Sequence, residues 1–140
     1  MKTKRWAFMS RFDIRDPDGG LYLRRWRIIQ TPLFAIYLHK IMRPDWRPLL
    51  HDHPWSFIAI VLRGGYTEKR LDLHTRTTYR HRVKRLNVVR RDDAHYIESL
   101  GRNPTWTLCL VGARRRDWGY VIPPMQGSVE WGWMRWSDVA

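Results

Sequence analysis

A chain of 140 residues is long enough for one domain with a buried core, and its 44% hydrophobic content fits a globular protein. The single cysteine, Cys109, excludes an intrachain disulfide and a cysteine-rich zinc cluster, and it fits a reducing compartment. The net charge of +13 would attract nucleic acids or small anions, although a basic surface that contacts only water has the same composition.

Near the N-terminus the apolar stretch is only WAFM, residues 6–9. It is too short for a signal peptide, and no apolar run in the chain is long enough to cross a membrane. We therefore expect a cytoplasmic protein with no membrane partner.

Turn residues divide the first half of the chain into short apolar and aromatic pieces, which is the pattern of strands. DPDGG at residues 16–20 predicts a turn, and the prolines of residues 43–50 predict a loop. Strands are expected at residues 21–30, 33–42 and 53–63. Gly64 and Gly65 predict a hairpin after the last of them.

Residues 77–89 alternate in character along the chain. One side is basic, with Arg80, Arg82 and Lys84, and the other carries Tyr79, His81 and Val83. Such alternation predicts a half-exposed strand with its basic face in water.

The rest of the chain continues the strand pattern. Strands are expected at residues 95–100, 106–113 and 118–123, and the tail at 129–136 either adds a strand or packs across an end. No segment keeps an apolar stripe of helical spacing over three turns. The sequence therefore predicts an all-β antiparallel sandwich or barrel in a single domain, residues 1–140.

The stretch HDHPWSFIAIVLRGGY, residues 51–66, places two histidines one residue apart before an apolar run. Alternate residues of a strand share a face, so a strand that begins here would direct His51 and His53 inward and Asp52 away. Two imidazoles at this spacing can share a metal ion, whereas two unpaired buried histidines would cost free energy. A proline-adjacent loop with two surface histidines is the alternative. A third ligand would come from a neighbouring strand, and RRDDAHYIESL supplies His95.

These motifs resemble those of the cupin superfamily. Its first motif has H-x-H, an apolar strand and a glycine about eleven residues on, matched here by His51, His53 and Gly64, and its second motif contributes one histidine, matched by His95. The closest similarity is to three-histidine cupins of the cysteine dioxygenase type. The chain also resembles small phage-encoded and bacterial proteins carrying HDHPW, most of them without an assigned activity.

The resemblance implies a jelly-roll fold and a divalent metal held by His51, His53 and His95. Many cupins add a glutamate ligand four or five residues after the second histidine, where this chain has Phe57 and Ile58. A centre of three histidines is therefore favoured, with Fe(II) preferred and Zn(II) or Ni(II) as alternatives. Asp92 or Asp93 could replace or support His95, because RRDDA stands where the second cupin motif has proline and glycine.

Three further residues are candidates for the chemistry of such a site. Tyr66 or Tyr96 could place a phenol beside the metal to hydrogen-bond a substrate or donate a proton, and Arg63 could pair with a substrate carboxylate. Each has a plainer interpretation, which is a core position for the tyrosines and a solvent-facing turn for Arg63. His39 and His81 are expected to be structural, and Cys109 to be a buried small hydrophobe.

The favoured function is a metal-binding cupin of the dioxygenase type that acts on a small anionic or thiol-containing substrate. One alternative is a non-catalytic cupin that binds an anionic ligand or nucleic acid through its basic surface. Another is a metal-independent cupin isomerase. Nucleic acid is the less favoured partner because no recognised binding module is present, and a homodimer is expected by resemblance to other cupins.

Overall fold

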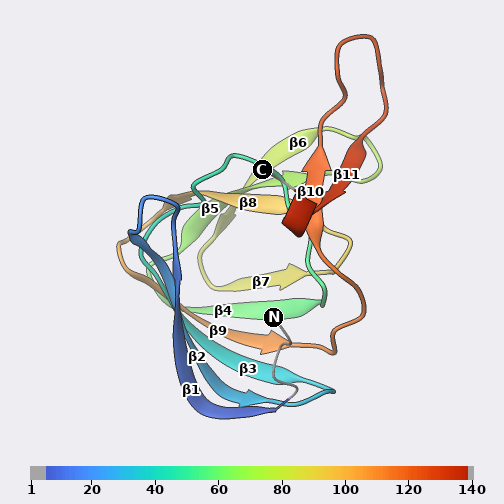
Figure 1. Ribbon diagram of the computed structural model, residues 1–140. Coiled ribbons are helices and arrows are strands. Elements are labelled where there is room, and N and C mark those ends of the chain that lie inside the picture. The colour runs from blue at the N-terminus through green and yellow to red at the C-terminus, as the bar shows by residue number, and fades with distance from the viewer. Residues whose placement is uncertain (1–5, 139–140) are drawn as a thin grey trace.

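Antiparallel strands arranged in two layers form the molecule, and the structure, a computed structural model, describes residues 6–138 (Figure 1). The larger sheet has six strands, which in spatial order are β1 (Ala7–Arg15), β2 (Leu21–Gln30), β3 (Ala35–Ile41), β9 (Thr105–Val111), β4 (Phe57–Arg63) and β7 (Leu86–Val89). The strands facing it are β6 (Thr78–Val83), β5 (Tyr66–Leu71) and β8 (His95–Leu100), and beside them lie β10 (Gly119–Ile122) and β11 (Gly132–Arg135). A short 3-10 turn, η1 (Trp136–Asp138), follows.

The two groups of small strands are joined by an extended segment around His51. Backbone hydrogen bonds of 3.0 Å run both ways between His51 and His95 of β8. On the other side, the amide of Asp52 donates to the Gly119 carbonyl at 3.0 Å, and the amide of Val121 donates to the Leu50 carbonyl at 2.8 Å. The H-x-H motif therefore lies inside the second layer, between β8 and β10.

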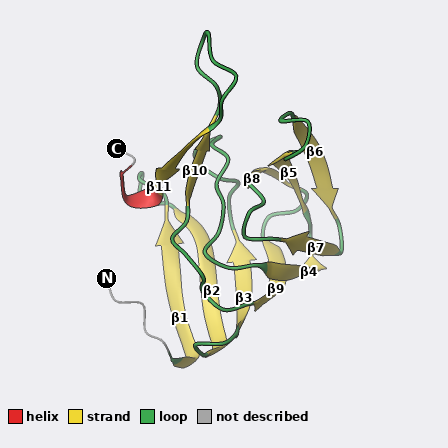
Figure 2. Ribbon diagram, turned by 90° about the vertical axis from the view of Figure 1, so that its right-hand side faces the viewer, coloured by secondary structure: helices red, strands yellow, loops and turns green. Residues whose placement is uncertain are grey.

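Figure 2 shows the two layers of strands, and one of the two buried clusters lies on the inward face of the larger sheet. Along β3 and β9 every second residue is buried, as expected for strands with one inward face. The cluster formed there consists of Ala35, Tyr37, Ala59, Cys109 and Val111, with Trp55 and Phe57 packed against it. These strands form the rigid wall that faces the histidines.

The outer face of β4, β7 and β9 is apolar. Because the inward residues of β4, β7 and β9 include Ala59, Asn87 and Cys109, their strand neighbours point outward. Exposed aliphatic side chains on this face belong to Ile58, Leu86, Val88 and Leu110. Ile58 pairs with Val88 on one side and with Leu110 on the other, so the side chains form a continuous row across three strands.

The all-β, antiparallel prediction is confirmed, but the hairpin expected at Gly64 and Gly65 is wrong. β4 belongs to the larger sheet and β5 to the smaller one, so these glycines carry the chain from one layer to the other. Both have positive φ, +91° and +128°. A Cβ at Gly65 would lie 2.7 Å from the Val83 carbonyl oxygen, so the crossing requires glycine for both its backbone angle and its close approach.

Other strand boundaries also differ from expectation. Residues 77–89 form two strands, β6 and β7, because the chain turns between Val83 and Leu86 and changes sheets. The strand expected at 53–63 begins only at Phe57. The sequence analysis missed β1, although it pairs with β2 along most of its length, and the tail does add a strand, β11. Within residues 6–138 no helix is long and apolar enough to cross a membrane.

Candidate metal centre

Three imidazole rings converge between the layers. His51, His53 and His95 each offer a ring nitrogen, and these three atoms lie within 4.8 Å of one another. Their ring centroids are 4.9 to 5.1 Å apart, and Nε2 of His53 lies 3.4 Å from Nε2 of His95. No other group of three or more histidine, cysteine or acidic side chains in the described part of the chain has such a geometry.

Sheet geometry explains why the histidines meet. His51 and His95 are directly paired residues of neighbouring strands, so their side chains point to the same face. His53 follows in the same extended segment at the i+2 position, which returns to that face. Asp52 lies between them and uses its carboxylate elsewhere, where it accepts hydrogen bonds of 2.8 Å from the Gly119 amide and from the Trp133 indole.

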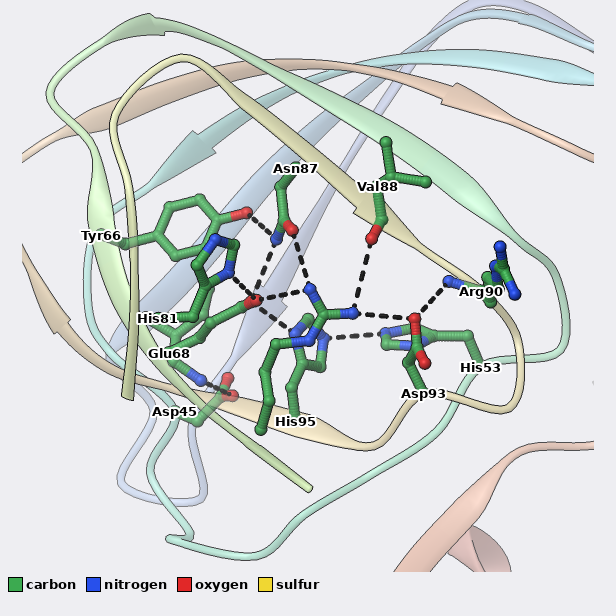
Figure 3. A network of polar contacts seen from close by, with 12 residues as sticks. Asp45, His53, Tyr66, Glu68, His81, Asn87, Val88, Arg90, Asp93 and His95 are labelled. Carbon is green, nitrogen blue, oxygen red and sulfur yellow. Dashed lines mark hydrogen bonds and ion pairs between the residues drawn. The ribbon is translucent and has the colours of Figure 1, made fainter. Parts of the chain in front are cut away.

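Glu68 holds the outer side of His95 (Figure 3). This carboxylate has no exposed surface, and its Oε2 lies 2.6 Å from Nδ1 of His95. Since a carboxylate only accepts, Nδ1 carries a proton, and in the neutral ring Nε2 of His95 keeps its lone pair for the space shared with His53. A hydrogen bond from a ligand histidine to a carboxylate is a common arrangement around protein metals.

The same carboxylate is the centre of a wider network. Its oxygens also accept from Nδ1 of His81 at 3.0 Å and from Nδ2 of Asn87 at 3.1 Å, and Arg70 lies at 3.4 Å. Burial alone would raise the pKa of Glu68, but the hydrogen bonds and charges of His95, His81 and Arg70 outweigh it and lower that pKa. Glu68 is therefore a fixed negative charge beside the cluster.

His51 and His53 favour the neutral form of the imidazole. Desolvation lowers the pKa of His51, and desolvation together with the neighbouring histidines lowers the pKa of His53 well below its ordinary value. Neutral imidazole is the form that coordinates a metal. In addition, Nδ1 of His53 is buried without a hydrogen-bond partner. The donor set and its protonation state therefore fit a divalent metal.

The histidines open onto a cavity of about 440 Å³ between the layers. This volume suits a small-molecule ligand. The aromatic residues of its wall include Tyr37, Trp55, Phe57, Trp118 and Tyr120. The cavity also contains polar groups, among them Arg25, His39 and Tyr66.

Of the three residues expected to assist the chemistry, Tyr66 alone lines this cavity. Its hydroxyl accepts a hydrogen bond of 2.9 Å from Asn87, and burial raises its pKa. Tyr96 follows His95 on β8, so it faces the opposite side of the sheet and packs against the cluster of Leu50, Leu71 and Ala94. Arg63 is exposed at the end of β4 after an irregularity in register.

The alternatives for the third ligand lie elsewhere. Asp93 pairs with Arg70 at 2.8 Å, and Asp92 is an exposed partner of Arg116 at 3.6 Å. His81 reaches the cluster only through Glu68. Glu68 is the residue beside the cluster that sequence reasoning missed. Its signal was weak: an acidic side chain in YTEKRL, two residues after Tyr66, looks like the polar half of an exposed strand.

No protein-family model matches the chain, and no curated protein sequence matches it. Solved structures do. HEPD from Streptomyces albus, with 2-hydroxyethylphosphonate and Fe(II) bound, superposes with a TM-score of 0.54 at 18% identity, over 75% of this chain and 24% of that one. Oxalate decarboxylase from Bacillus subtilis gives 0.51 at 16% identity, over 77% of this chain and 30% of that one.

A third similar structure is closer in length. A variant of PAC13 from Streptomyces, with uridine, superposes with a TM-score of 0.53 at 11% identity, over 86% of this chain and 92% of that one. By contrast, this chain spans only about a quarter of HEPD and about a third of the oxalate decarboxylase. Likeness at such identities concerns the backbone alone. With the two antiparallel layers and the histidine cluster between them, it shows that this chain has the cupin fold.

Proposed function

We propose that this protein is a metal-dependent cupin of the dioxygenase type that acts on a small anionic substrate. His51, His53 and His95 would hold one divalent metal, with Fe(II) favoured over Zn(II) or Ni(II). The observation that carries the proposal is the convergence of three ring nitrogens within 4.8 Å beside a cavity of about 440 Å³. Three protein ligands leave coordination positions free for a substrate or dioxygen.

When bound, the metal would supply the redox chemistry of the reaction, and the chain's own residues would do the rest. Glu68 would keep Nδ1 of His95 protonated, so that Nε2 stays available as a ligand. The aromatic wall would exclude water from the substrate. Tyr66 stays protonated because burial raises its pKa, and its hydroxyl could donate a hydrogen bond to a bound substrate.

The choice of iron is supported by similarity to solved structures. HEPD matches with Fe(II) bound and so does HppE, which superposes with a TM-score of 0.51 at 14% identity. Their substrates are not transferred to this chain, because identity is low. Iron is favoured over zinc or nickel on this likeness only, since three imidazoles accept all three metals.

The decisive experiment is elemental analysis of protein purified without a histidine tag, before and after anaerobic loading with Fe(II). We expect close to one equivalent of metal in the wild type and almost none in His53→Ala, with the melting temperature of the variant near that of the wild type. His81→Ala is the matched control, because this histidine contacts Glu68 but not the cluster. A full equivalent in His53→Ala would refute the centre. Oxygen consumption by the loaded protein, with candidate acids, then tests the enzyme class.

The two alternative functions predict different results for metal content and ligand binding. A metal-independent isomerase would bind no metal and turn over without it. A nucleic-acid binder would show a salt-dependent shift that weakens when Arg80, Arg82 and Lys84 are neutralised. Arg80 is already paired with Glu98, through hydrogen bonds of 2.7 and 3.1 Å, which reduces the charge this face offers to a polyanion.

A further inference from the structure

Arg25 of β2 is a cation inside the molecule that has no acidic partner among residues 6–138. Its side chain lines the cavity that the three histidines share. The guanidinium lies over the ring of Tyr37, with 4.6 Å to the centroid, and over Phe12 at 5.4 Å. No ion pair joins it to a carboxylate anywhere in residues 6–138. A charge held in apolar surroundings is costly unless a counter-charge is supplied.

The carboxylates of the cavity wall are occupied elsewhere. Asp16 pairs with Arg43 at 3.1 Å. Asp45 accepts hydrogen bonds from the Tyr22 hydroxyl and from the Ile97 amide. Asp52 is bound by Gly119 and Trp133, as described above. None of the three has an ion pair or hydrogen bond with Arg25, so no described carboxylate of the cavity wall neutralises this cation.

His39 fixes the direction of the guanidinium. Nε of Arg25 donates to Nε2 of His39 at 2.8 Å, which makes Nε2 the acceptor nitrogen. The ring proton is then on Nδ1, which faces the sulfur of Cys109 at 3.5 Å. Burial and the charge of Arg25 both lower the pKa of His39, so its ring stays neutral and remains an acceptor. The NH1 and NH2 groups of Arg25 have no hydrogen-bond partner within residues 6–138.

We propose that Arg25 binds the acidic group of the substrate, so that the site selects molecules that carry a carboxylate or a phosphonate. The two free amino groups of a guanidinium match two oxygens of such an acid. His39 would be the positioning residue, because it contacts Arg25 and not the substrate. This assignment rests on the proposed function for its chemistry, but anion binding itself needs no metal.

The test is a ligand-observed NMR titration of the full chain, in parallel with and without metal. Propionate and methylphosphonate are the anionic probes, and propionamide is the neutral probe of the same size as propionate. We expect both anions to bind the wild type and propionamide to bind at least about tenfold more weakly, since hydrogen bonds to a charged group have that strength. Equal binding of propionate and propionamide would overturn the assignment.

Variants test the residue. Arg25→Gln should weaken both anions about tenfold or more and leave propionamide unchanged. Arg27→Gln is the matched control: Arg27 is on the same strand and stacks on Phe12 at 4.8 Å, but it does not line the cavity. Arg27→Gln should leave the affinities near the wild-type values. An equal loss in both variants would mean a general charge effect and would refute a specific anchor at Arg25.

A second variant and a metal measurement distinguish the remaining outcomes. If Arg25→Gln does not fold, Arg25→Lys replaces it, and this variant should keep a weaker preference for the anions because lysine retains the charge without the fork. Unchanged anion affinity in a folded Arg25 variant would overturn the assignment. Metal content is measured on the same preparations. Selective anion binding without metal uptake would refute the metal centre alone, whereas full metal uptake without anion selectivity would refute Arg25 alone.

Discussion

The carboxylate of Glu68 is bonded to the ring of His95 at 2.6 Å, on the side away from His53. Replacing Glu68 with Gln removes the negative charge and allows the imidazole to rotate or change tautomer. We expect metal affinity to fall about 10- to 100-fold, the usual effect of losing such a partner. Competition with a chelator of known affinity measures the loss.

A control for this substitution is available on the neighbouring strand. Glu98 of β8 is also paired with an arginine, Arg80, but lies on the outer side. Glu98→Gln should leave metal affinity unchanged. Unchanged affinity in Glu68→Gln, with the fold intact by circular dichroism, would mean that this carboxylate has a structural role only.

A second prediction concerns Gly65, where the chain crosses between the two layers. Gly65→Ala should lower the free energy of unfolding by about 2 kcal/mol or more, because the new Cβ is strained at φ +128° and meets the Val83 oxygen at 2.7 Å. Gly19→Ala is the control, since Gly19 has φ +86° with nothing within 4 Å, and its cost should be about 1 kcal/mol. Chemical denaturation measures both. A Gly65→Ala protein as stable as Gly19→Ala would contradict the role of close approach.

Much of the fold was predictable because turn residues and two-residue alternation mark strands locally. His51, His53 and His95 could also be selected, because H-x-H before an apolar run is a local pattern. The sheet to which each strand belongs could not be predicted, because it depends on pairing between segments that are distant in the sequence. Gly64 and Gly65 have the composition of a hairpin turn, yet they connect two different sheets.

Two of the charged residues at or near the cavity also could not be predicted from the sequence. Glu68 and Arg25 lie on strands where charged residues alternate with others, so each looks like a solvated side chain. Which face of such a strand is buried depends on the opposite layer. Alternation from His95 would have excluded Tyr96 from the site, because adjacent strand residues point to opposite faces, yet Tyr96 was kept as a candidate.

We expect the stability of the fold to decrease in acid, because His39 is buried in its neutral form. Its folded-state pKa lies well below the unfolded value of about 6.5. Below that pH protons bind preferentially to the unfolded chain, so stability that is present at neutral pH is lost on acidification. We expect the melting temperature of metal-free protein to fall between pH 7 and pH 5, and to fall less steeply in His39→Gln when each protein is referred to its own value at pH 8. An identical slope would contradict a buried neutral His39.

The apolar outer face of β4, β7 and β9 favours the expected homodimer. Two copies can meet face to face along these strands, since the row through Ile58, Val88 and Leu110 contains no charge to repel its symmetry mate.

Sedimentation equilibrium decides the assembly state. We expect a dimer in the wild type and a monomer in the Ile58→Lys/Val88→Lys double variant, because two lysines would be buried against two others. The Arg80→Gln variant, changed on the opposite layer, should remain dimeric. A monomeric wild type at tens of micromolar protein would contradict the dimer.

His51 and His95 are neighbours at two levels: their ring centroids lie 5.1 Å apart at the candidate centre, and their backbones share mutual hydrogen bonds of 3.0 Å. A metal that bridges the rings would also hold the two strands together, because separating the backbones would require breaking a coordination bond. The amides of these two residues should then exchange with deuterium more slowly in the metal-loaded protein, while amides of β1 at the far edge of the other sheet keep their rates. Local opening of the second layer would thus become a direct reporter of whether the centre is occupied.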